Sequence, residues 1–325
     1  MKTDEIVEMT LSEVRNVMVE RYLFHLKNPD RRLRPLYLEG HAGIGKTQIV
    51  RLVAKALSEI IKEPVACEIL NLQFCERPDF MGLPRIDNEG NTTFARPKIL
   101  PNAGKGILFL DEANRVDSDI QSGMLTLLED RNINGHELGS DWMIVLAGNP
   151  SGGDGGSNQY KVGDFDFALR DRIAKIGVTG NFDDLICYLQ MKYTNHILLK
   201  FLEYCPEFIS FDGQGCSPRS FEYALRSTLS ITDFNDPIFL RNLAIELGPH
   251  SAVHILKILS SGYIPTLKNI LRRDPKVFEY LDKNFERQDV LLSVIDQIYN
   301  FITGNADKNV NLKSDDVSAI VEFLM

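Results

Sequence analysis

Residues 40–47 read Gly-His-Ala-Gly-Ile-Gly-Lys-Thr, the complete pattern G-x-x-x-x-G-K-[ST] of a phosphate-binding loop. The apolar run 36–38 precedes this loop, and a helical pattern begins at Gln48. Glycine lets backbone N–H groups close around phosphate oxygens, and the N-terminus of the next helix favours negative charge. The alternative, a chance match in an ordinary glycine turn, is disfavoured by this strand–loop–helix context.

The loop therefore supplies the first candidate site residues. Lys46 is expected to reach the outer phosphates, and the Thr47 hydroxyl is expected to ligate Mg²⁺. The candidate nucleotide-binding residues of this segment are Gly40, His41, Ala42, Gly43, Ile44, Gly45, Lys46, Thr47 and Gln48.

The length, composition and net charge of the chain limit the classes of protein to which it can belong. The chain has 325 residues, 44% hydrophobic and 25% charged, which suits about two globular domains. No apolar run approaches the ~20 residues that span a bilayer, and no apolar signal core follows the charged N-terminus. We therefore expect a cytoplasmic protein without a membrane span. The net charge of −9 disfavours long tracts of nucleic acid as the main partner.

The cysteines give no sign of a disulfide framework or a zinc site. The chain has five, widely scattered, and no pair has C-x-x-C spacing. Buried reduced thiols are the expected state.

Apolar patterning predicts strands that alternate with helices in the first half of the chain. Helical spacing marks 11–28, the segment from Gln48, and 120–128, and strands are expected at 36–38, 65–72, 106–110, 142–147 and 173–178. A hairpin is expected within 83–97, around the turn 87–90. This order predicts a doubly wound parallel α/β domain over residues 1–180.

From residue 181 onward nearly every segment has helical periodicity, including 236–262 and 276–302. Residues 181–325 are therefore expected to form an all-helical lid domain with a C-terminal helical extension. The glycine-rich segment 152–156 is expected to be a mobile loop.

Two carboxylates follow the apolar run 106–110. Ligands of open α/β sheets bind beyond the carboxyl ends of the strands, so Asp111 and Glu112 should face the phosphate loop. Asp111 suits a Mg²⁺ ligand, and Glu112 suits activation of the attacking water. The alternative is two solvated carboxylates at the start of a loop, which the upstream phosphate loop disfavours.

Asn149 follows the next buried strand and could orient the water between Glu112 and the outermost phosphate. The alternative is an ordinary Asn-Pro turn. The order of the three strand ends favours the sensing role.

Three arginines are further candidates. Arg170 and Arg172 lie just before a strand, where an arginine could neutralise charge on a neighbouring subunit's nucleotide or simply pair with Asp171. Spacing alone does not choose between these roles. Arg219 lies at the start of an expected helix whose N-cap is Ser217 and whose first position is Pro218. It could contact the γ-phosphate from the lid, or be a solvated first-turn arginine.

These motifs, in this order, resemble those of AAA+ ATPases. Residues 40–47 match Walker A, 108–112 Walker B, Asn149 sensor 1, Arg172 the arginine finger and Arg219 sensor 2. Further segments resemble the MoxR branch and its dynein-related relatives: 77–82 with 94–97, 110–115 with 125–129, 147–150, 160–162 and 166–172, and the hairpin position 132–141.

The resemblance implies a P-loop NTPase that binds ATP and Mg²⁺ and hydrolyses ATP at the subunit interfaces of a homo-oligomeric ring, a hexamer. It implies a chaperone-like role on a protein client, together with a von Willebrand factor A domain partner. His41 replaces a proline that is frequent in the family. Between the two candidate fingers, Arg172 is favoured because it directly precedes the apolar residue that opens the strand.

Two rival functions remain at this point. One is a nucleic-acid motor or loader on the same core, which the acidic balance disfavours. The other is a nucleotide-sensing scaffold that barely hydrolyses, which the intact Lys46, Asp111, Glu112 and Asn149 disfavour.

Overall fold

The computed structural model describes residues 6–150, 165–194, 196–213, 215–231 and 233–260, together with residues 270–273, 275, 277, 298, 317, 318, 320 and 321. The chain divides into two compact units, Met1–Asp184 and Leu185–Met325. The predicted glycine-rich loop 152–156 and the motif residues 160–162 lie outside the described residues, as does most of the predicted helical stretch 276–302.

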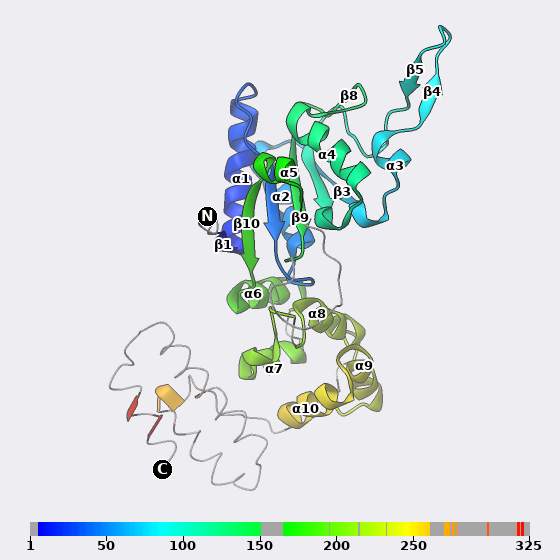
Figure 1. The fold of residues 1–325 in the computed structure, drawn as a ribbon. Helices are drawn as coiled ribbons and strands as arrows, with labels where there is room; N and C mark the ends of the chain where they lie inside the picture. The colour runs from blue at the N-terminus through cyan, green and yellow to red at the C-terminus, as the bar shows by residue number, and fades with distance from the viewer. Residues whose placement is uncertain are drawn as a thin grey trace. The chain divides into compact units, whose positions relative to one another are not determined.

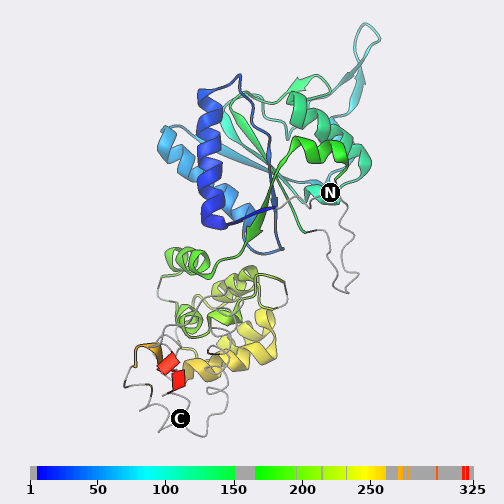
Figure 2. The same ribbon diagram turned by 60° about the vertical axis from the view of Figure 1, so that its left-hand side comes forward.

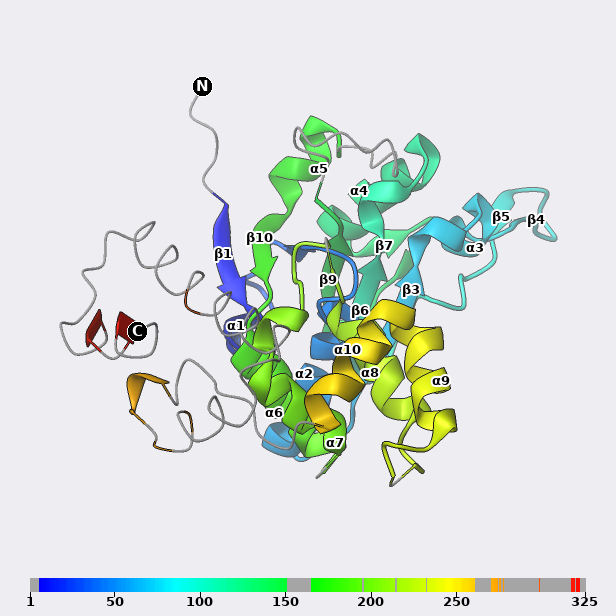
Figure 3. The same cartoon turned by 90° about the horizontal axis from the view of Figure 1, so that it is seen from below.

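The first unit is built on a six-stranded sheet whose neighbouring strands all pair in parallel (Figure 3). Across the sheet the strands are β1 (Val7–Thr10), β10 (Ala174–Thr179), β2 (Leu36–Glu39), β9 (Trp142–Gly148), β6 (Lys105–Asp111) and β3 (Val65–Asn71). This arrangement confirms the predicted doubly wound α/β core.

Helices cover both faces of this sheet, with α1 and α2 on one side and α4 and α5 on the other (Figure 2). Their bounds are α1 (Leu11–Lys27), α2 (Lys46–Ile61), α4 (Ser118–Asp130) and α5 (Phe167–Arg172). A capping box between Thr10 and Glu13 fixes the start of α1. Helix α2 begins at Lys46 rather than at the predicted Gln48, because Gly45 precedes it in a left-handed conformation.

Two hairpins extend from the unit. Strands β4 (Pro84–Ile86) and β5 (Thr92–Phe94) form the predicted hairpin with its turn at 87–90, which projects away from the sheet (Figure 1). Strands β7 (Asn132–Ile133) and β8 (His136–Glu137) form the second within 132–141. The short elements η1 (Leu72–Phe74), α3 (Arg77–Met81) and η2 (Ala113–Arg115) were not predicted.

The core explains why β6 and β9 read as unbroken apolar runs. From Ile107 to Leu110 every side chain is at most 1% exposed, because helices lie on both faces. Gly106 has no room for a side chain, since an added Cβ would lie 2.5 Å from the Trp142 ring. The indole Nε1 donates to the Ala103 carbonyl at 3.0 Å. The glycine and the tryptophan therefore fix the start of both strands together.

The second unit is helical in its described part. Its elements are α6 (Phe182–Lys192, which begins in the last residues of the first unit), α7 (Ile197–Tyr204), η3 (Pro206–Phe208), α8 (Pro218–Ser227), α9 (Pro237–Leu247) and α10 (Pro249–Ser260). The predicted stretch 236–262 is two helices, because Gly248 takes φ +87° between them. Within the described ranges, no helix combines the length and apolar character that crossing a bilayer requires.

The expectation of buried thiols is largely wrong. Only Cys205 is buried, Cys187 is exposed, and the other three are half-buried. All five are free.

Candidate functional site

The loop between β2 and α2 has the backbone of a phosphate cradle. Gly43 and Gly45 take φ +86° and +112°, conformations that side chains disfavour. Gly40 donates to the Gly148 carbonyl at 3.2 Å, and a Cβ there would lie 2.8 Å from the carbonyl oxygen of Val178. The loop is thus held against the ends of β9 and β10.

The other loop residues divide by exposure. His41 and Ala42 are exposed, while Ile44 is buried and anchors the loop. Gln48, in the first turn of α2, is half-buried. His41 therefore occupies an open position, where its size meets little steric constraint.

Lys46 is buried with its ammonium group inside the loop. Its Nζ donates to the carbonyls of Gly40 at 2.5 Å and His41 at 3.1 Å, and to Asn149 Oδ1 at 3.3 Å. A buried charge requires such partners. The ammonium is consequently held at the centre of the loop, where phosphate oxygens could exchange for these acceptors.

Thr47 and Asp111 meet across the gap between α2 and β6. The Thr47 hydroxyl donates to Asp111 Oδ2 at 2.9 Å, and Asp111 Oδ1 accepts from the Glu112 backbone N–H at 3.0 Å. Hydroxyl and carboxylate oxygens are the ligands Mg²⁺ prefers, and phosphates and waters complete its shell. This donor pair therefore fits Mg²⁺. In the described part of the chain, no group of three His, Cys, Asp or Glu side chains is placed to hold a metal.

Glu112 leaves the strand in an unusual conformation. Its φ of +55° is left-handed, uncommon for a non-glycine residue, and it redirects the chain into η2. The carboxylate accepts from Asn149 Nδ2 at 3.1 and 3.3 Å and pairs with Arg115 Nε at 3.1 Å. Adjacent strand residues normally point to opposite faces, and this turn brings both carboxylates to one site.

Asn149 joins the two halves of the site. It is 8% exposed, and its amide accepts from Lys46 while donating to Glu112. Its backbone carbonyl accepts from Asn114 Nδ2 at 2.7 Å. Asn114 itself is 4% exposed, and its Oδ1 has no hydrogen-bond partner in the described structure.

Sequence reasoning missed the roles of Asn114 and Arg115. Both lie in η2, directly after the two carboxylates, and each contacts a predicted site residue. The available signal was their position: polar side chains immediately after a strand end that carries a site.

The two candidate finger arginines differ in their surroundings. Both lie on α5, not in a loop, since the helix ends at Arg172 and β10 starts at Ala174. Arg172 donates from Nε and Nη2 to Glu129 Oε2, at 2.9 and 2.6 Å. Arg170 is exposed and donates from Nε to the Phe165 carbonyl at 2.9 Å.

Arg219 lies in the first turn of α8 in the second unit and is exposed. The predicted start of this helix is confirmed, since Ser217 Oγ accepts from the Ser220 N–H at 3.1 Å and Pro218 takes the first helical position. The role of Arg219 toward a nucleotide stays a prediction.

Comparison with known proteins agrees with the geometry of the first unit. Residues 35–173 match the family model described as AAA domain, dynein-related subfamily. The match covers less than half of the 325 residues. The first unit thus has the P-loop NTPase fold of AAA+ proteins, and residues 35–173 are similar to the AAA domains of the dynein-related subfamily.

Solved structures that the chain matches include two of RuvB from Thermotoga maritima. One, of a point mutant, has TM-score 0.43 and 15% identity, over 73% of this chain and 71% of that chain. The other, described as the Holliday junction branch migration motor, has TM-score 0.39 and 13% identity, over 93% and 95%. Hsp104 with ATPγS and casein has TM-score 0.39 and 13% identity, over 72% and 48%. No curated protein matches the chain.

Proposed function

We propose that this protein is a Mg²⁺-dependent ATPase and that its hydrolytic site is formed by Lys46, Thr47, Asp111, Glu112 and Asn149. One observation carries the proposal: Asn149 bridges the Lys46 ammonium and the Glu112 carboxylate through its two amide ends. The Lys46 ammonium, which can bind phosphate, and the Glu112 carboxylate, which can accept a proton from water, thereby belong to one hydrogen-bond network.

The residues divide the work by their chemistry. The loop N–H groups and Lys46 would bind the phosphates, and Thr47 with Asp111 would hold Mg²⁺, whose charge would offset that of the outer phosphates. Glu112 accepts a proton from the attacking water, which Asn149 orients. Arg115 pairs with one oxygen of Glu112 at 3.1 Å, and because a carboxylate has about four acceptor sites, the attacking water can still donate to Glu112.

The site is proposed to be completed by a neighbouring subunit in a hexameric ring. Arg172, or else Arg170, would contact the γ-phosphate in trans, and Arg219 would report nucleotide state from the helical domain, taken as 181–325. Arg172 is 32% exposed, so its pair with Glu129 lies at the surface. Such a pair contributes only about 0–1 kcal/mol and can be exchanged for a phosphate.

Mixing two inactive variants tests this arrangement. Lys46→Ala lacks a phosphate grip but keeps Arg172, whereas Arg172→Ala keeps Lys46 but lacks the finger. In mixed rings, an intact Lys46 site can be completed by a neighbour's Arg172, so ATPase activity should return on mixing. If mixtures of Lys46→Ala with Arg172→Ala stay inactive, while mixtures of Lys46→Ala with Arg170→Ala regain ATPase activity, Arg170 would be assigned as the finger instead.

We propose that the ring remodels a protein client in the manner of the MoxR branch, with a von Willebrand factor A domain partner, in the cytoplasm. The projecting β4–β5 hairpin, with Ile86 79% exposed, is the proposed coupling element. A pull-down with Glu112→Gln, which should stall with ATP bound, would identify the client. Strong stimulation of ATPase activity by DNA, with no protein retained, would favour the nucleic-acid motor instead.

A further inference from the structure

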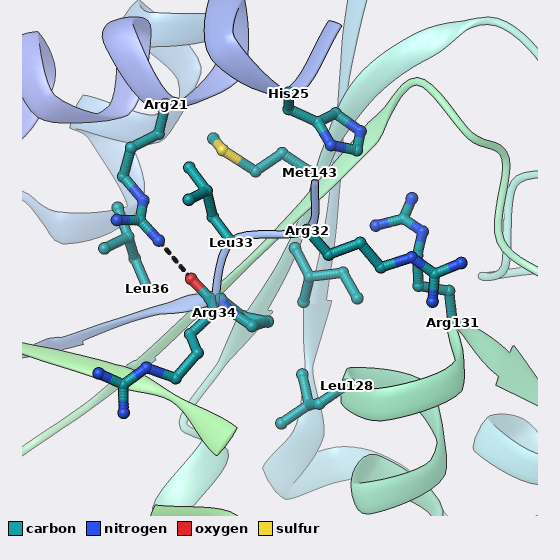
Figure 4. Close-up of a pocket in the computed structure, with 11 residues that line it drawn as sticks. Arg21, His25, Arg32, Leu33, Arg34, Leu36, Leu128, Arg131 and Met143 are labelled. Atoms are coloured by element: carbon teal, nitrogen blue, oxygen red, sulfur yellow. Dashed lines mark hydrogen bonds between the residues drawn. The ribbon is translucent and has the colours of Figure 1, made fainter. Parts of the chain in front are cut away.

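A small cationic pocket lies at the end of the sheet opposite the phosphate loop (Figure 4). Its walls come from the last turns of α1, the segment 32–36, the end of α4 and the start of β9. The lining residues are Arg21, His25, Arg32, Leu33, Arg34, Pro35, Leu36, Leu128, Arg131, Met143 and Ile144. Four of them are arginines and none is acidic, which is unexpected in a chain of net charge −9.

Among the described residues, the hydrogen-bond partners of the four guanidinium groups are all backbone carbonyls. Arg21 donates to the carbonyl of Arg34, and Arg131 donates to those of Gly139 and Trp142. The contacts of the two loop arginines are longer, at 3.4 Å each, to the carbonyls of residues 129 and 171. Within the described ranges, none of the four forms an ion pair with a carboxylate.

Two carboxylates near the pocket, Glu129 and Asp141, have other partners. The Glu129 side chain pairs with Arg172. Asp141 Oδ2 lies 4.0 Å from Lys105 Nζ, and the charge of Asp141 acts to raise the pKa of His25 at the pocket edge. His25 also contacts the Ser140 carbonyl, and burial lowers its pKa, so it adds little charge at neutral pH. Among the described residues, no carboxylate therefore lines the pocket or pairs with its four arginines.

Like charges crowd one another in this pocket. The Arg32 side chain extends toward Arg131 (Figure 4). Burial first, and then the charge of Arg32, lowers the pKa of Arg131 to about 10. Burial and Arg34 act in the same direction on the pKa of Arg21. The negative end of α4 accounts for a cation at Arg131, its C-cap, but not for the exposed Arg32 and Arg34.

We propose that this pocket binds a single phosphate group, with Arg32 and Arg131 as its principal ligands and Arg34 at the rim. The cavity volume of about 50 Å³ holds roughly four water-sized groups, which suits one tetrahedral oxyanion. Guanidinium forks bind phosphate oxygens in pairs, which favours phosphate over a monatomic anion. The phosphate is either free or part of a polynucleotide, since the recognition chemistry is shared.

Calorimetric titration of the full chain with inorganic phosphate tests the proposal. The titration uses the Lys46→Ala background, so that the phosphate loop does not contribute. Arg32→Gln with Arg34→Gln should weaken phosphate binding at least tenfold, because both side chains are exposed and their loss leaves the fold intact. Arg15→Gln, an exposed arginine earlier on α1, is the matched control and should change nothing. ATP plays no part, so failure here is separable from failure of the proposed ATPase.

Two further ligands identify the source. One is a single-stranded oligonucleotide of about ten nucleotides. If it binds through Arg32 and Arg34 and free phosphate does not bind, the ligand is the phosphate of a polynucleotide. If free phosphate binds and the oligonucleotide does not, the ligand is free phosphate. The proposal is overturned if neither binds, or if the double variant binds both as the parent does. It is also overturned if hexaglutamate alone binds through these arginines, which would make the pocket a carboxylate site.

Discussion

Replacing Asn149 by aspartate tests the bridge between the two halves of the site. The exchange keeps the shape of the side chain but turns the amide into a carboxylate. The wild-type amide donates to Glu112 at 3.1 Å and accepts from Lys46 at 3.3 Å. Asn149→Asp therefore places a negative charge between an anion and a cation.

The magnitude follows from these distances. With an effective dielectric constant of about 20, two unit charges about 3.2 Å apart interact by roughly 5 kcal/mol. This energy is an upper value for a site that water partly screens. Repulsion from Glu112 and attraction to Lys46 nearly cancel, so the fold should survive. The attraction, however, holds the ammonium away from phosphate, and the repulsion displaces the carboxylate that activates water. We expect ATP affinity to fall at least tenfold and turnover at least a hundredfold.

Asn149→Ala is the matched control, because it removes both contacts without adding charge. ATP binding is measured by fluorescence anisotropy of a labelled analogue, and turnover by phosphate release. The alanine variant should lose turnover but bind ATP more tightly than the aspartate variant. Equal ATP affinity in wild type and Asn149→Asp would refute the inferred competition for Lys46.

Three other predictions concern single contacts. Lys46→Ala should weaken ATP binding at least a hundredfold by anisotropy, and unchanged binding would disprove the phosphate-loop assignment. Gly106→Ala should lower the free energy of unfolding by about 1–3 kcal/mol in a denaturant titration, because its Cβ meets the Trp142 ring at 2.5 Å; full stability would show that the ring can move. Although burial alone raises it, hydrogen bonds from Lys192, Arg226 and Tyr193 lower the pKa of Glu222 to about 2. Because the pKa is lowered in the folded state, the ionised carboxylate stabilises the fold at pH values above 4.5. This stabilisation is lost as the pH falls toward 2. Glu222→Gln should thus cost about 1–3 kcal/mol at pH 7 and little near pH 2; a cost that does not depend on pH would contradict this origin.

The core of the fold could be predicted because its signals are strong and local. Strands buried on both faces, such as 106–110, read as continuous apolar runs, and the glycines at 43 and 45 occupy positions where positive φ is required. Strand β1 was missed because it is short, carries Glu8 and leaves Val7 58% exposed at the sheet edge. Edge strands of this kind lack an apolar run.

Other parts of the site depend on contacts between distant residues. The left-handed turn at Glu112 and the bond from Asn114 to the Asn149 carbonyl arise only when β6 and β9 pair. The Arg172–Glu129 pair joins α5 to α4 across 43 residues of sequence. Spacing cannot reveal such partners, nor the cationic pocket, whose arginines come from three separate segments.

The most direct test of the hydrolytic site compares ATP binding and phosphate release in the wild type and in Glu112→Gln. The glutamine keeps an oxygen and a donor near Asn149 but cannot accept the proton of water. We predict unchanged ATP affinity with phosphate release reduced at least a hundredfold. Phosphate release at the wild-type rate would show that another group activates the water, and would contradict the assignment of Glu112.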